Sequence, residues 1–137
     1  MEELKSTPID PDVRTLLSFA TAHEKVKVEY DLYIHSSQRK LFGFVKNNAL
    51  LGCIGIELLD HDWCEVKHIA VMPQHRGEGI GKQMIDFIRR HGSFSGITAE
   101  TDEEAVMFYK KIGFEVRSLG EKYPGVKRFK CRLSMEE

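Results

Sequence analysis

Apolar residues recur along the chain either at helical spacing or in alternation with polar residues. The first pattern predicts helices and the second predicts strands. A first helix is expected over about residues 11–21. Asp10 is a residue type that caps helix N-termini, Pro11 suits the first helical position, and apolar side chains follow at helical spacing. The N-terminal segment before this helix contains Pro8 and shows no strand pattern.

The segment over about residues 24–35 supports two interpretations. Its apolar residues alternate strictly with polar ones, which favours a strand. The same residues also form pairs at i,i+4, Val28 with Leu32 and Tyr30 with Ile34, and such pairs are compatible with a helix. Periodicity by itself therefore favours the strand and leaves the helix open.

Three consecutive antiparallel strands are predicted next, over about 40–46, 49–59 and 63–72. Asn47-Asn48 forms the first connection, since asparagine tolerates a positive φ, and a short acidic turn forms the second. Strict alternation in the third strand places Glu65, Lys67 and Ile69 on one face and Cys64, Val66 and His68 on the other.

The second half of the sequence begins with a glycine-rich loop and an amphipathic helix, after Pro73 has ended the third strand. A short strand is expected over 96–101. Residues 101–104 then form a capping box that starts a helix reaching Gly113. Two last strands, over 114–118 and 126–133, flank a Tyr-Pro-Gly turn.

Composition narrows the class of protein. With 137 residues, the chain fits one domain over 1–137, and a formal charge of -1 argues against a nucleic-acid partner. No apolar stretch is long enough to cross a membrane, and the polar, acidic N-terminus is unlike a signal peptide. The three cysteines are widely spaced, and no histidine or cysteine spacing indicates a metal site. We therefore expect a cytoplasmic protein that uses no metal.

The glycine-rich loop is the strongest chemical signal. A strand, a glycine turn and a helix N-terminus together favour phosphate binding, because free backbone N–H groups and the helix dipole attract an anion. The P-loop pattern fails, since Arg76 stands where its first glycine is required, and the dinucleotide fingerprint fails because Lys82 replaces its third glycine. The pattern Q/R-x-x-G-x-G/A does match, through Gln74, Gly77 and Gly79.

With the preceding Ile-Ala-Val-Met-Pro and the later Phe-Tyr-Lys-Lys-Ile-Gly-Phe, this motif resembles the GNAT family of acetyl-CoA-dependent N-acetyltransferases. The resemblance implies an α/β (α+β) fold with a mixed, mostly antiparallel sheet of six to seven strands and about four helices. It also places a helix, not a strand, at about 24–35. The residues that it assigns to acetyl-CoA are Ile69, Ala70, Val71, Gln74, Arg76, Gly77, Glu78, Gly79, Ile80, Gly81, Lys82, Asp102 and Tyr109.

Two residues are the catalytic candidates. Tyr109 matches the tyrosine that acts as general acid near the sulfur of coenzyme A in many members, and the alternative is that it only packs in the core. Glu65 matches the glutamate that histone-type members use as base, and the alternative is a solvent-facing or salt-bridged residue. His68 and Glu57 are the fallback bases.

The sequence departs from the family pattern at two places. Asp102 replaces the usual asparagine, which affects one polar contact to coenzyme A, and no first strand is visible. Glu78 must point away from the bound phosphate. Near the expected acceptor end, Asp60, Asp62 and Glu65 would suit a cationic amine. The basic segment 121–132 either meets the 3′-phosphate of coenzyme A or faces water.

The predicted activity is transfer of the acetyl group of acetyl-CoA to a primary amine by direct attack in a ternary complex. The acceptor is a small molecule or a protein amine, and exposed edge strands make a homodimer plausible. The alternative is a non-catalytic acetyl-CoA sensor or an interaction module on the same fold.

Overall fold

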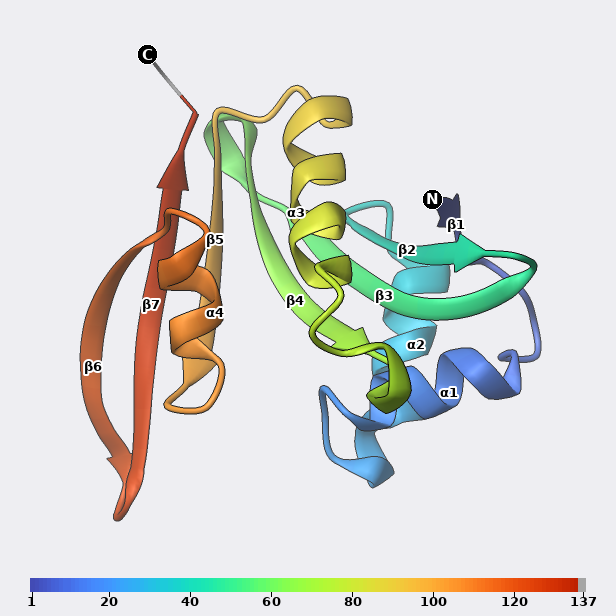
Figure 1. The fold of residues 1–137 in the computed structure, drawn as a ribbon, viewed down its shortest axis with the longest axis horizontal. Coiled ribbons are helices and arrows are strands. Elements are labelled where there is room, and N and C mark those ends of the chain that lie inside the picture. The colour runs from blue at the N-terminus through green and yellow to red at the C-terminus, as the bar shows by residue number, and fades with distance from the viewer. Residues whose placement is uncertain (136–137) are drawn as a thin grey trace.

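The computed structural model describes residues 1–135 and forms one seven-stranded mixed sheet with helices on both faces (Figure 1). The strand order is β1-β2-β3-β4-β5-β7-β6. Only the β4–β5 pair is parallel among the described strands. The strands are β1 (Glu2–Glu3), β2 (Arg39–Lys46), β3 (Ala49–Leu58), β4 (Trp63–Val71), β5 (Gly96–Asp102), β6 (Glu115–Tyr123) and β7 (Val126–Ser134). The predicted fold class is confirmed.

Four helices cover the sheet, two on each face. Two hydrophobic clusters result: one lies between the sheet and α3 and α4, the other between β2–β4 and α1 and α2. Over β5, β7 and β6, the face opposite α4 has no described helix packed against it (Figure 1). The helices are α1 (Pro11–Ser18), α2 (Val26–His35), α3 (Ile80–His91) and α4 (Val106–Lys111).

The segment whose period favoured a strand is the helix α2, so the expectation drawn from alternation is wrong and the one drawn from the family resemblance is confirmed. The side chains that the helix buries are Val26, Tyr30 and Tyr33, at i, i+4 and i+7. Its two tyrosine hydroxyls bond outside the helix, to the Ser6 carbonyl and to His68. These tertiary contacts, which no local pattern encodes, decide between the two interpretations.

Several boundaries also differ from the sequence expectations. Glu2–Glu3 pairs with β2, so a short first strand exists where none was visible. The first helix ends at Ser18, and β6 extends to Tyr123. The expected capping box does not form; instead, the Asp102 carboxylate accepts a hydrogen bond from the Ala105 N–H at 2.9 Å, ahead of α4.

The free edges of the sheet are β1 and β6, and a homodimer through either one stays a prediction.

A β-bulge in β4 interrupts the strict alternation that the sequence predicted. Gly55 lies opposite His68, whereas the next residue of β3, Ile56, lies opposite Val66, which leaves Lys67 as the extra residue. Before the bulge, Val66 points into the cluster under α3; after it, Ala70 points into the cluster under α1 and α2. The bulge therefore exchanges the two faces of β4, and His68 does not share a face with Val66.

Beyond the bulge, β4 and β5 separate. Their parallel pairing covers only four residue pairs, from Trp63–Gly96 to Val66–Ala99. After that point β4 continues to Val71 and β5 to Asp102 with no pairing between them, and Figure 1 shows the two strands diverging. The backbones of β4 and β5 therefore separate from Lys67 onward, and we call this separation of the two strands the opening.

Candidate functional site

The glycine loop lies at the end of β4, where the opening is widest (Figure 1). Gly77 and Gly79 both have φ of +82°, a conformation that side chains other than glycine rarely adopt. The first backbone hydrogen bond of α3 runs from the Gln83 N–H to the Gly79 carbonyl. Because no side chain among the described residues caps this helix, the N–H groups of residues 80–82 remain free to donate to an anion.

Charged side chains of the loop are held away from these N–H groups. Arg76 donates from Nε to the Val71 carbonyl at 3.0 Å, and its guanidinium carbon lies 5.1 Å from the centre of the Phe19 ring. Glu78 is half exposed and pairs with His75 at 3.2 Å. This pairing agrees with the expectation that Glu78 points away from a bound phosphate. The loop therefore presents mainly its backbone to a ligand.

The second half of β4 offers a free strand edge. Ile69, Ala70 and Val71 pair with β3 on one side, while the side facing β5 has no strand partner among residues 1–135. Extended backbone with unpaired N–H and C=O groups can bind a chain of amides as an added strand. Apart from the Val71 carbonyl, which accepts from Arg76, this edge fits the pantetheine arm of coenzyme A, and the glycine loop at its end fits the pyrophosphate.

Tyr109 lies on α4, inside the cluster that α3 and α4 share with the sheet. Its ring packs edge-on against Phe108 and Phe114, with centroid distances of 5.1 and 5.2 Å. Burial raises the pKa of its phenol above the ordinary value for tyrosine. The hydroxyl consequently stays protonated at neutral pH, as a proton donor requires.

Glu65 projects from β4 on the face opposite α3, between Glu57 of β3 and Thr98 of β5 in the register. Its side chain is 21% exposed, and its nearest cation is Lys67, with 3.7 Å between Nζ and Oε2. Thr98 next to it carries the one fully buried side-chain oxygen without a partner in the described part of the chain. Glu65 is thus a reachable carboxylate at the narrow end of the opening.

The two fallback bases are already engaged. The Glu57 carboxylate accepts from Arg39 Nε at 3.0 Å. His68 is 6% exposed, and burial lowers the pKa of its imidazole to about 4. Since burial also raises the pKa of Tyr33, the tyrosine hydroxyl donates to His68 Nδ1 and leaves the ring proton on Nε2, 3.5 Å from a Glu29 oxygen. Glu65 is the better base on these contacts.

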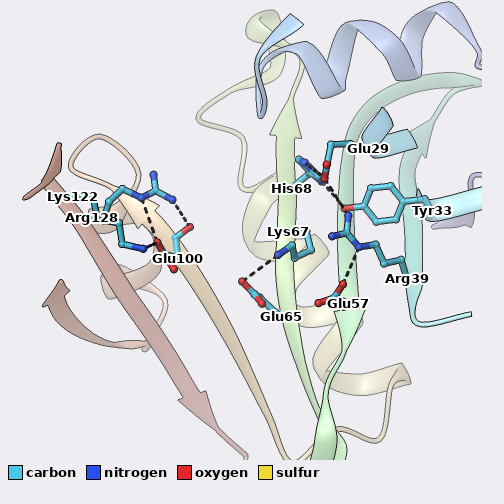
Figure 2. A network of polar contacts seen from close by, with 10 residues as sticks. All are labelled: Glu29, Tyr33, Arg39, Glu57, Glu65, Lys67, His68, Glu100, Lys122 and Arg128. Atoms are coloured by element: carbon cyan, nitrogen blue, oxygen red, sulfur yellow. Dashed lines mark hydrogen bonds and ion pairs between the residues drawn. The ribbon is translucent and has the colours of Figure 1, made fainter. Parts of the chain in front are cut away.

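Sequence reasoning missed Glu29, Tyr33 and Arg39, which complete this network (Figure 2). Arg39 bridges two carboxylates, those of Glu57 and Glu29, the latter at 3.1 Å. Glu29 and Tyr33 are four residues apart, so a helix at 24–35 puts them on one face. A helix over 24–35, once adopted, would have indicated that Glu29 and Tyr33 lie side by side.

A second polar group lies across the opening (Figure 2). Glu100 of β5 accepts from Lys122 Nζ at 2.7 Å, and Arg128 Nε is 3.7 Å from the same carboxylate. The Lys122 contact holds the pKa of Glu100 below its usual range. The basic segment 121–132 thus places Lys122 and Arg128 beside the opening.

The aspartates expected near the acceptor do not reach the opening. Asp60 and Asp62 lie in the turn before β4, at the end where β4 and β5 are still paired. Cys64 is fully buried, and burial raises the pKa of its thiol to about 12, which makes it a poor nucleophile. Residues 1–135 contain no cluster of three or more metal-ligating side chains, and none of their helices is long and apolar enough to span a membrane.

Comparisons with known proteins agree with this arrangement. A model of the acetyltransferase (GNAT) domain matches residues 37–116. An uncharacterized N-acetyltransferase in the lysA 3′ region of Bacillus methanolicus is 32% identical over 77 residues. That match covers 54% of this chain and 64% of the relative, so the chain spans less than two thirds of the length of this relative.

Solved structures share the fold over nearly the whole chain. An aminoglycoside 6′-N-acetyltransferase complexed with coenzyme A superposes with a TM-score of 0.81 at 15% identity, covering 100% of this chain and 98% of the other. A GNAT acetyltransferase from Elizabethkingia anophelis with acetyl-CoA bound has a TM-score of 0.76 at 19% identity, with coverages of 98% and 96%. The fold is that of the acetyltransferases. By its domain match, the chain belongs to the GNAT acetyltransferase family.

Proposed function

We propose that this protein is an acetyl-CoA-dependent N-acetyltransferase that acetylates a primary amine by direct attack in a ternary complex. The observation that carries the proposal is the opening between β4 and β5, which starts at Lys67 and ends at the glycine loop. Bound acetyl-CoA would supply an activated acetyl thioester. The similar structures solved with coenzyme A or acetyl-CoA support this choice of ligand.

Binding would use backbone more than side chains. The free edge of Ile69, Ala70 and Val71 would hold the pantetheine amides, with the Val71 N–H directed to the thioester oxygen. The N–H groups from Arg76 to Lys82 would hold the pyrophosphate, and Gln74 and Asp102 would contact the cofactor at the margins of the site. Asp102 already caps the turn before α4, which limits its carboxylate to a secondary contact.

Proton transfer would involve two residues on different elements. Glu65, on β4, would take a proton from the acceptor ammonium, either directly or through water, to free its lone pair. Tyr109, on α4, would give its phenol proton to the leaving sulfur, because burial keeps that phenol protonated. Lys67 would move aside as the acceptor ammonium approaches Glu65.

Replacing Tyr109 by Phe tests the proposal. Release of free thiol from acetyl-CoA should slow about 100-fold, as is typical for loss of a general acid, while acetyl-CoA binding measured by calorimetry stays intact. Tyr123→Phe is the matched control, because this tyrosine is 69% exposed at the tip of the β6–β7 hairpin. It should leave turnover unchanged.

The outcomes separate the competing functions. Normal turnover by the Tyr109→Phe protein would remove this residue from the mechanism. If the wild-type protein binds acetyl-CoA but releases no thiol with any amine in a broad panel, it is a sensor and not an enzyme. No protection from unfolding by millimolar coenzyme A would instead indicate an interaction module. The panel should contain both small amines and lysine-containing peptides.

A further inference from the structure

The two sides of the opening carry opposite net charge. On the β4 side, three carboxylates, those of Glu29, Glu57 and Glu65, face only two cations, Arg39 and Lys67. His68, in the middle of this group, is neutral because burial lowers its pKa to about 4. The β4 side therefore has a net charge of about -1 at neutral pH, by the ordinary charge states of these groups.

The β5 side is basic. Glu100 lies in the middle of this group, with Lys122, Arg128 and Lys130 around it. Lys130 is the register partner of Glu100 on β7, so its side chain lies on the same face. Asp102, the register partner of Arg128, lies on the same face two residues after Glu100, so the net charge here is about +1 by the same ordinary charge states.

Both groups lie on the face of the sheet opposite α3 and α4. Figure 2 shows Glu65 and Lys67 on one side of the gap and Glu100 with its two cations on the other. β6 has a bulge at Lys122, and Nζ of this lysine reaches Glu100 of β5 across the intervening strand β7. No described helix packs over β5, β7 and β6 on this face, so the cations remain accessible to a ligand in the opening.

We infer that the acceptor is an amine that also carries an anionic group, as a free amino acid does. The inference rests on the proposed acetyl transfer and adds the substrate class. The ammonium would approach Glu65, while the carboxylate would bind between Arg128 and Lys122 on the opposite side. A polyamine would place its second cation against the basic side, which opposes binding, and an amine without an anionic group would make no charge-assisted contact with the two cations.

Matched acceptors test the inference. Thiol release is measured with a set of L-amino acids, with the corresponding amino acid amides, and with putrescine. Because a charge-assisted hydrogen bond is lost in the amide, kcat/KM should be about ten- to hundredfold higher for the acid. The α-amine of an amino acid amide is less basic than the α-amine of the free amino acid. The chemical reactivity of the amine by itself would therefore favour the amide. A preference for the acid therefore reports binding of its carboxylate.

Variants locate the effect. Arg128→Gln, and independently Lys122→Gln, should reduce kcat/KM for amino acids about tenfold and leave the values for amides unchanged. Lys127→Gln is the control: it removes a neighbouring cation of β7 that pairs with Glu103 at 3.8 Å, and it should alter neither class. Calorimetry with acetyl-CoA checks that each variant is folded.

Three results would overturn the inference. The first is equal or higher kcat/KM for the amides or for putrescine. The second is a parallel loss for acids and amides in both variants. In each of these cases acetyl transfer itself stands. The third is acetyl-CoA binding without thiol release for any acceptor, including the amides and putrescine, which refutes the proposed function and the substrate class with it.

Discussion

Stability at acidic pH depends on the buried imidazole of His68. Burial lowers its pKa from 6.5 to about 4 in the folded protein, whereas in the unfolded chain the group is expected near 6.5. Below pH 6.5 the unfolded state therefore binds more protons than the folded state. The free energy of unfolding must fall as pH decreases, and this contribution levels off below about pH 4.

The size of this effect follows from the pKa difference. Each pH unit between the two pKa values corresponds to about 1.4 kcal/mol, so about 2 kcal/mol is lost between pH 7.5 and 5.0. Unfolding entropy of about 2.1 cal/mol/K per residue converts this loss for 137 residues into a decrease in Tm of about 7 °C. Urea denaturation at each pH can be followed by the fluorescence of Trp63, the one tryptophan of the chain.

The control is His68→Gln, which keeps an acceptor for Tyr33 and a donor for Glu29 but cannot titrate. Acid-sensitive carboxylates such as Glu100 contribute equally to both proteins, so they cancel in the difference. The wild-type protein should lose about 2 kcal/mol more than the variant between pH 7.5 and 5.0. A difference below about 0.5 kcal/mol, within ordinary experimental error, would refute a neutral, buried His68.

Three further substitutions have defined outcomes. Gly55→Ala should lower the free energy of unfolding by about 2–3 kcal/mol in urea denaturation, because its Cβ would overlap the Tyr33 hydroxyl; an unchanged midpoint would contradict this packing. Gly79→Ala and the control Gly125→Ala should each cost about 1–2 kcal/mol through positive φ, but only the first should weaken acetyl-CoA binding in calorimetry. Thr98→Val removes an unpaired buried hydroxyl and should raise stability by about 1 kcal/mol; a loss of stability would reveal a hidden partner.

Elements with strong local signals could be predicted from the sequence. The glycine loop, the helix after it and the three-stranded meander are confirmed because turn residues and amphipathic periods are local properties. Gly77 and Gly79 show the predicted use of glycine directly, since both adopt positive φ. The resemblance to acetyltransferases drew on these same residues, and the domain match confirms it.

Elements determined by distant contacts could not be predicted from local patterns alone. The segment 24–35 satisfies both periods, and only the family resemblance favoured the observed helix; the contact of Tyr33 with His68, 35 residues away, is visible in no local pattern. The site residues Glu29 and Arg39 became apparent only once that helix was placed against the sheet. Likewise, the alternation of residues in β4 gives no local sign of a bulge, because the apolar period continues through Lys67.

The bulge at Lys67 links the acceptor side to the cofactor side. With a side-chain period of two, an unbroken β4 would place His68 on the face of Val66, among the apolar side chains under α3. The network that joins α2 to β4 would then not form, since His68 could not meet Tyr33. The same extra residue marks where β4 leaves β5. One inserted residue therefore turns His68 toward Tyr33 and lies where β4 separates from β5, the two features on which the proposed acceptor and cofactor sites depend.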